Sequence, residues 1–143
     1  MQPDKQIPRP ALYLGFSGLL PFFAGTGLHL AGIYSDGIDI LTRYGTVILC
    51  FMSGVLWGFA ARDPNQTNHL WAYALSTVPA LWVFFATITP GINLLVALLL
   101  GFVGLLGLDW LFANRGLTPP WWMKLRILLT LVVVLCLLIA LIV

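Results

Sequence analysis

Long apolar runs alternate with short polar segments along almost the whole chain. A helix needs about 20 predominantly apolar residues to cross the hydrocarbon core of a bilayer. Five runs are close to this length or longer, and each is bounded by charged or turn-forming residues: 11–34, 41–61, 70–88, 92–113 and 125–143. The pattern predicts an all-α, polytopic membrane protein with five transmembrane helices.

The polar segments between these runs are short. They read "SDGIDI" at 35–40, "RDPNQTNH" at 62–69, "TPG" at 89–91 and "NRGLTPPWWMK" at 114–124. Connections of this length make consecutive helices antiparallel neighbours. We therefore expect one compact bundle, with residues 1–143 forming a single transmembrane domain.

The amino-acid composition also indicates a membrane protein. Hydrophobic residues make up 60% of the chain and charged residues 8%, and the mean hydropathy is +0.98. A soluble domain carries about a quarter charged residues, so these values exclude a soluble globular protein. The bilayer is the partner that the composition requires.

The cations are divided unequally between the two ends of the predicted bundle. With five spans, one end receives Lys5, Arg9, Arg62, Arg115, Lys124 and Arg126, and the other receives Arg43. Cytoplasmic loops carry the excess of Lys and Arg, so we expect a cytoplasmic N-terminus and a C-terminus on the opposite face. The cations are spread along a rim and form no patch, which argues against nucleic-acid binding.

Small residues recur on one face of two predicted helices, at every fourth position in the second helix and three residues apart in the fourth. Helices in lipid associate through close packing, which small residues permit. We expect packing seams inside the bundle on these two faces; the alternative is that one of them lines a narrow cavity or contacts a second protein. The residues of the two stripes are Thr46, Cys50, Gly54 and Gly58 in the second helix, and Gly101 and Gly104 in the fourth.

Two prolines, Pro21 and Pro79, lie inside predicted helices. Each removes one backbone donor, so we expect a kink at each. Ser17 precedes the first proline, and Ser76 and Thr77 precede the second, close enough to help satisfy the freed carbonyls.

Asp109 is one of two ionisable residues predicted within the membrane, where such residues are default pointers to function. It lies near the cytoplasmic end of the fourth helix. We expect an interfacial carboxylate paired with Arg62, Arg115 or Arg126, in which case Asp109→Asn would leave the fold nearly intact. The alternative is a carboxylate that binds a proton or a substrate.

His29 is the second ionisable residue predicted within the membrane, and it lies near the outer end of the first helix. We expect its ring to bind a carbonyl or the Asp36 and Asp39 carboxyls on the same side; the alternatives are a haem or metal ligand and a proton relay. Two-histidine haem ligation is disfavoured, because His69 is predicted at the opposite membrane face.

Motifs that carry catalysis or cofactor binding do not occur in the sequence. Cys50 and Cys136 fall near the middle of their spans, where thiols behave as small apolar groups. Intramembrane enzymes bring several polar groups together at one depth, whereas here the polar residues are scattered between two faces. We expect a protein that is not an enzyme and needs no cofactor.

Five segments carry a resemblance to a known family: "LGFSGLLPFF" at 14–23, "YGTVILCFMSGVLWG" at 44–58, "STVPALW" at 76–82, "GLLGLDW" at 104–110 and "PPWWMKLRILLTLVVVLCLL" at 119–138. Together they resemble a bacterial inner-membrane family of unknown function that is related to the mitochondrial transmembrane protein 69. The resemblance implies a five-helix bundle in a bacterial or mitochondrial inner membrane. It brings no catalytic residues.

Two functional classes follow from these observations. The first is a small accessory, assembly or stabilising subunit that packs against a larger membrane complex, with a respiratory complex as one candidate, or against itself. The second is a small oligomeric transporter or lipid-handling protein. An outward-facing line of small residues would favour the first class, and a polar cavity reaching the midplane would favour the second.

Overall fold

The computed structural model describes residues 6–62 and 70–143. The described residues form six α-helices and no strand: α1 (Arg9–Ser17), α2 (Leu20–Leu30), α3 (Tyr34–Ala61), α4 (Leu70–Ile88), α5 (Leu94–Asn114) and α6 (Trp122–Ile142). Helices α1 and α2 together make one apolar span, so these residues contain five spans long and apolar enough to cross a membrane. The prediction of an all-α polytopic bundle is confirmed.

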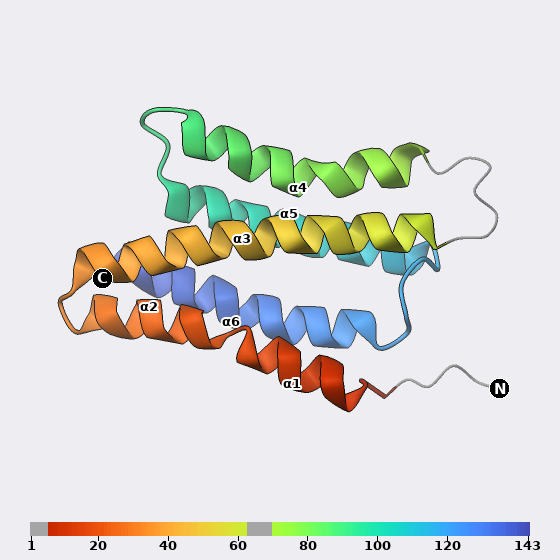
Figure 1. Cartoon of the computed structure of the whole chain (residues 1–143), viewed down its shortest axis with the longest axis horizontal. Helices are drawn as coiled ribbons and strands as arrows, with labels where there is room; N and C mark the ends of the chain where they lie inside the picture. Colours follow the sequence, from red (N-terminus) through yellow and green to blue (C-terminus); the bar gives the residue numbers. More distant parts are fainter. Residues whose placement is uncertain (1–5, 63–69) are drawn as a thin grey trace.

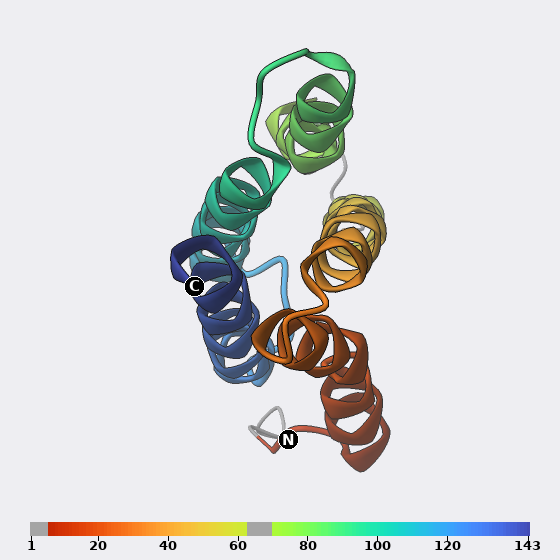
Figure 2. The ribbon, with the colours of Figure 1, turned by 90° about the vertical axis from the view of Figure 1, so that its left-hand side faces the viewer.

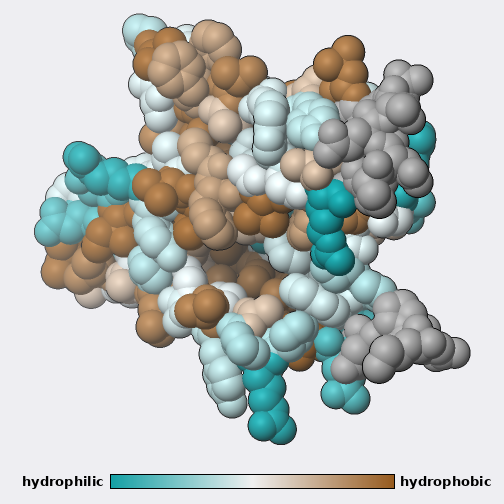
Figure 3. All heavy atoms as spheres, turned by 45° about the vertical axis from the view of Figure 1, so that its right-hand side comes forward, coloured by the Kyte–Doolittle hydropathy of each residue, from teal (hydrophilic) through white to brown (hydrophobic). Residues whose placement is uncertain are grey.

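The spans run along one common axis, with the start of α1 and the end of α6 at opposite ends of the bundle (Figure 1). Seen end-on, α5 and α6 lie on one side and α2 and α3 on the other (Figure 2). Helix α4 packs at one edge against α3 and α5, and α1 diverges at the other edge, where it contacts α6. Hydrophilic side chains lie mainly toward the ends of the molecule, and the surface between them is largely apolar (Figure 3).

The end of the bundle where α1 begins carries most of the cations, and we call it the basic end. Arg9, Arg62, Arg115 and Lys124 lie at helix starts or ends there. Lys5, which the sequence also placed at this end, lies outside the described residues. The basic end is the face that we expect in the cytoplasm.

The first span is broken where the sequence places Pro21. Helix α1 ends at Ser17 and α2 begins at Leu20, with the proline near its start. A proline cannot donate the helical hydrogen bond, and at the beginning of a helix it has none to lose. The predicted kink is therefore confirmed as a complete break, and it lets α1 leave the bundle.

Pro79 lies inside α4, which continues through it. The hydroxyls of Ser76 and Thr77 donate to the carbonyls of Tyr73 and Ala74 at 2.7 and 2.8 Å. The carbonyl whose donor Pro79 removes is that of Leu75, four residues earlier. The prediction that these hydroxyls satisfy the freed carbonyl is therefore wrong.

Helix α3 begins earlier than the hydropathy pattern predicts. The expected loop at 35–40 forms its first turns, and the actual connection from α2 is Ala31–Ile33, with Gly32 at a φ of +83°. Asp36 in the first turn favours a helix start through the helix dipole. A helix of 28 residues is about 42 Å long, more than the roughly 30 Å of hydrocarbon, so its charged first turns reach beyond the core of the bilayer.

Helices α2 and α3 approach each other most closely at Gly25 and Gly37. A Cβ atom added to Gly37 would lie 2.6 Å from the carbonyl oxygen of Gly25 and 2.7 Å from the backbone nitrogen of His29. Both neighbours are backbone atoms, which cannot rotate away. The crossing therefore requires the absence of a side chain at residue 37.

Gly37→Ala should lower the free energy of unfolding by about 1–3 kcal/mol, because the added methyl forces the two helices apart. Gly27→Ala on α2 is the matched control, since a Cβ there meets nothing within 4 Å. That change should be neutral or slightly stabilising, because alanine favours a helix more than glycine does. Unfolding by SDS in mixed micelles, followed by circular dichroism, measures both; equal stabilities would contradict the close crossing.

Candidate functional site: a buried ion pair beside an apolar cavity

A charged network joins α5 to α6 near the basic end. Arg126 Nε donates to Asp109 Oδ2 at 2.7 Å, and Trp122 Nε1 donates to Asp109 Oδ1 at 2.7 Å. The side chain of Asp109 is fully buried, and that of Arg126 is 5% exposed. Each carboxylate oxygen therefore accepts one hydrogen bond in a site without solvent.

The chain between α5 and α6 brings these residues together. Gly116, at a φ of +73°, allows the turn that follows α5, and α6 then returns antiparallel to it. Asp109 lies about a turn and a half before the end of α5, and Arg126 lies one turn after the start of α6. The two residues consequently reach the same depth.

The prediction that Asp109 pairs with one of three arginines is confirmed, and the partner is Arg126. Arg62 and Arg115 line a separate polar pocket of about 360 Å³ with Gly116 and Thr118 at the basic end. The guanidinium of Arg115 lies 5.4 Å from the centre of the Trp71 ring. Asp109 lies near the basic end, as expected, and its side chain has no exposed surface.

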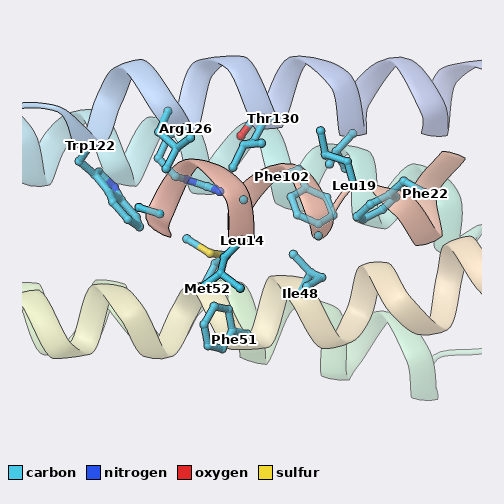
Figure 4. Close-up of a pocket in the computed structure, with 16 residues that line it drawn as sticks. Leu14, Leu19, Phe22, Ile48, Phe51, Met52, Phe102, Trp122, Arg126 and Thr130 are labelled. Carbon is cyan, nitrogen blue, oxygen red and sulfur yellow. The ribbon is translucent and has the colours of Figure 1, made fainter. Parts of the chain in front are cut away.

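A cavity of about 240 Å³ lies next to the ion pair, between α1, α2, α3, α5 and α6. Figure 4 shows Arg126 and Thr130 extending from α6 toward it, with Leu14, Met52 and Phe102 around them. Arg126 Nη2 and Thr130 Oγ1 are buried and have no hydrogen-bond partner among the described residues. The other lining side chains are apolar: Ala11, Leu14, Leu19, Phe22, Ile48, Phe51, Met52, Phe102, Leu125, Leu129 and Val133.

His29 is buried on α2, toward the opposite end of the bundle. Its ring packs edge-on against Tyr34 at 5.0 Å, and neither ring nitrogen has a hydrogen-bond partner within residues 6–62 and 70–143. The expected bond to a carbonyl or to the aspartates is therefore wrong: Asp36 accepts from Ser35, and Asp39 forms an exposed ion pair with Arg43.

The described part of the chain also brings together no group of three His, Cys, Asp or Glu residues around His29 or elsewhere. Metal or haem ligation by His29 thus receives no support from a second ligand. His69, the other histidine, falls outside the described residues.

The small-residue stripes divide into a buried part and an exposed part. Gly101 is buried, and a Cβ there would lie 2.7 Å from Leu49 Cδ2, so its predicted packing role is confirmed. Thr46 is half-buried. The other four members are exposed, and at the three glycines a Cβ would meet nothing within 4 Å: Cys50, Gly54, Gly58 and Gly104.

Packing inside the bundle is therefore the wrong prediction for these four residues. The buried seam of α3 runs through Gly45, Leu49, Leu56 and Ala60. This seam lies on a neighbouring face of α3. The buried residues of that face also follow one another at intervals of three or four. Spacing alone defines a face of a helix and does not say what covers that face.

Cys50 and Gly54 of the exposed α3 stripe line a groove on the outside of the bundle, between α3 and α4, and Gly58 lies one turn beyond Gly54. We call this groove the outer groove; it has a volume of about 420 Å³ and is lined by Cys50, Ser53, Gly54, Trp57, Ser76, Thr77, Ala80 and Leu81. The hydroxyl of Ser53 donates to the backbone carbonyl of Ser76 and joins the two helices beneath the groove.

Five apolar spans, tight connections and charges confined to the ends and to one buried pair define a multi-pass α-helical membrane protein. The chain belongs to the family described as "Protein of unknown function (DUF3429)", whose model matches residues 7–142. The expected relationship to transmembrane protein 69 is confirmed by the two relatives described next.

The chain is similar to Transmembrane protein 69 of Xenopus tropicalis, with 37% identity over 134 residues, 91% of this chain and 53% of the relative. It is also similar to Transmembrane protein 69 of Mus musculus, with 30% identity over 132 residues, 87% of this chain and 52% of the relative. The chain thus spans about half the length of these curated relatives. No solved structure matches it.

Asp109→Ala should lower the free energy of unfolding by roughly 3 kcal/mol, because it leaves the Arg126 guanidinium buried without a counter-charge. Asp109→Asn should cost less, since the amide oxygen still accepts a hydrogen bond. Adding Arg126→Met to Asp109→Ala should recover much of the loss, and equilibrium unfolding of the single and double variants measures this coupling.

Asp39→Ala serves as the control for that cycle, because it removes the exposed partner of Arg43. Its effect should stay within about 0.5 kcal/mol. Additive losses for Asp109→Ala and Arg126→Met would show that the pair does not act as a unit.

Proposed function

We propose that this protein is a small, non-catalytic accessory subunit that binds one transmembrane helix of a larger inner-membrane complex through the outer groove. The observation that carries the proposal is the line of exposed small residues, Cys50, Gly54 and Gly58, in which a Cβ at either glycine would meet nothing within 4 Å among the described residues.

Exposed glycines in a helix have a cost that packing by a partner would offset. Glycine destabilises a helix interior by about 1 kcal/mol relative to alanine. In lipid, no hydrophobic force favours helix association, so close backbone approach is a main source of binding energy, and glycine provides it. Gly54 and Gly58 thus make a surface suited to a second helix.

The shape of the outer groove favours a helix of another protein over a second copy of this chain. A two-fold dimer would place the same patch of each copy face to face. The depression between α3 and α4 is shallow and elongated along the two helices, and the ridge of a single helix would lie along it. Trp57 and Leu81 line the groove beside the small residues and would contact the sides of that helix.

Transport is the less favoured alternative. A transporter needs polar groups along a path through the membrane. The cavity beside Arg126 reaches Val133, about the middle of α6, but its lining is apolar apart from Trp122, Arg126 and Thr130. We propose a bacterial inner membrane as the location, with the basic end in the cytoplasm, because cytoplasmic loops carry the excess of cations.

The test is purification of the tagged full chain from its native membrane in a mild detergent, with quantitative mass spectrometry of proteins retained at near-equal amounts. The double variant Gly54→Leu with Gly58→Leu should lose such a partner at least tenfold, because a leucine at residue 54 would fill the groove and a leucine at residue 58 would block the surface one turn beyond it. Its own bundle should stay folded, since a Cβ at either position meets nothing.

Gly104→Leu with Gly107→Leu is the matched control, because these glycines are also exposed and open but lie on α5. It should retain the partner. A thiol-reactive cross-linker attached at exposed Cys50 should form one discrete product with that same protein, whereas Cys136 is buried. Retention of the partner by the Gly54 and Gly58 variant would refute docking at the outer groove.

A further inference from the structure

Thr130 and Thr26 differ from the other threonines in the helices, because their buried hydroxyls have no hydrogen-bond partner among the described residues, and of the two only Thr130 lines the cavity beside Arg126. Ser and Thr in helices usually donate to the carbonyl three or four residues earlier. The hydroxyls of Thr42, Thr46, Thr77 and Thr87 do so here at 2.6–2.8 Å. Thr130 Oγ1 is buried and makes no such bond within the described residues. A buried hydroxyl without a partner is costly, and this one lies at a cavity wall.

Arg126 has the same property one turn earlier on α6. Its Nε is used by Asp109, and its Nη2 is buried without a partner in the described part of the chain. In Figure 4 both side chains extend from α6 toward the space bordered by Leu14, Met52 and Phe102. Two buried donors without partners thus lie one turn apart on the wall of one cavity, where an acceptor from a bound molecule would offset the cost of leaving them unpaired.

We propose that this cavity binds a neutral, lipid-soluble molecule whose carbonyl oxygen accepts hydrogen bonds from Arg126 and Thr130. Two sources offer this chemistry: the acyl ester of a lipid and a lipid-soluble quinone. The proposal is independent of the outer groove, which lies between α3 and α4 and shares no residue with the cavity.

The charge of the site favours a neutral ligand. Asp109 already neutralises Arg126 at 2.7 Å, so the pair has no net charge. An anionic head group would add an uncompensated charge to a buried site and would lose its own hydration. A carbonyl oxygen avoids both costs and still accepts from Nη2 and from the Thr130 hydroxyl.

The rest of the cavity suits the apolar body of such a molecule. Its lining extends along α6 from Trp122 to Val133, a rise of roughly 16 Å, and includes Phe22 and Phe102. An apolar protein cavity of about 150 Å³ takes up benzene, and this one has about 240 Å³. Its entrance lies where Leu14 of α1 and Phe51 of α3 are exposed, which in a bilayer is the lipid-facing surface.

The test uses the full chain in lipid nanodiscs and native mass spectrometry to count bound molecules at a fixed mole fraction of probe. The probes are methyl dodecanoate, 2-decyl-1,4-benzoquinone, tridecane and dodecanoate. At least one of the two carbonyl probes should bind ten times more tightly than tridecane and more tightly than dodecanoate. A preference for the ester identifies a lipid as the source, and a preference for the quinone identifies a quinone.

Thr130→Val should weaken the preferred carbonyl probe about five- to tenfold and leave tridecane unchanged, because it removes one hydrogen bond and preserves the volume. Thr77→Val in the outer groove is the matched control and should bind as the wild type does. Met52→Phe should weaken the binding of the preferred carbonyl probe and of tridecane, because the larger side chain fills part of the cavity. All three variants are compared at equal helical content by circular dichroism, so that a loss of binding is not a loss of fold.

Three results would overturn the proposal. Tridecane binding as tightly as both carbonyl probes would show that the cavity does not recognise a head group. Dodecanoate binding most tightly would show that the site selects an anion. An unchanged affinity in Thr130→Val would exclude the hydroxyl as a ligand contact.

Discussion

The ion pair between Asp109 and Arg126 determines how α5 and α6 face each other. Apolar surface gives helices in lipid little reason to prefer one rotation over another. A buried charge allows only the rotation that keeps it paired, because an unpaired charge in this environment costs several kcal/mol. Since Trp122 also donates to Asp109, a shift of α6 along α5 by even one turn would break both bonds.

Weaker polar contacts do the same for the other neighbouring helices in sequence. Tyr44 of α3 donates to the carbonyl of Gly18, beside the break between α1 and α2. Ser53 of α3 donates to Ser76 of α4, and Trp82 Nε1 of α4 donates to the Ala97 carbonyl of α5 at 2.7 Å. Each consecutive pair of spans thus has a polar contact. The apolar side chains between these contacts fill space and do not need to specify the arrangement.

Hydropathy and turn residues predicted the number and order of the spans, because crossing a bilayer requires a run of apolar residues that is visible in the sequence. They missed the first turns of α3, since a helix that extends beyond the hydrocarbon core carries charges such as Asp36 and looks like a loop. The sequence predicted Arg62, Arg115 or Arg126 as the partner of Asp109. All three arginines were predicted at the depth of Asp109, so depth alone could not identify the partner. The position of Thr130 on a cavity wall had no local signal in the sequence, because the cavity is formed by residues of five helices.

Helix α3 forms a wall of both the cavity and the outer groove with side chains that alternate along the same turns. Ile48, Phe51 and Met52 face the cavity, and Cys50, Ser53 and Gly54 face the groove. Binding at one site can influence the other only if it favours a different position of α3. Tyr44 anchors this helix before the shared turns, and Ser53 anchors it within them. A ligand that fits the existing cavity would therefore leave the outer groove unchanged, and the two proposed sites would act independently on one rigid helix.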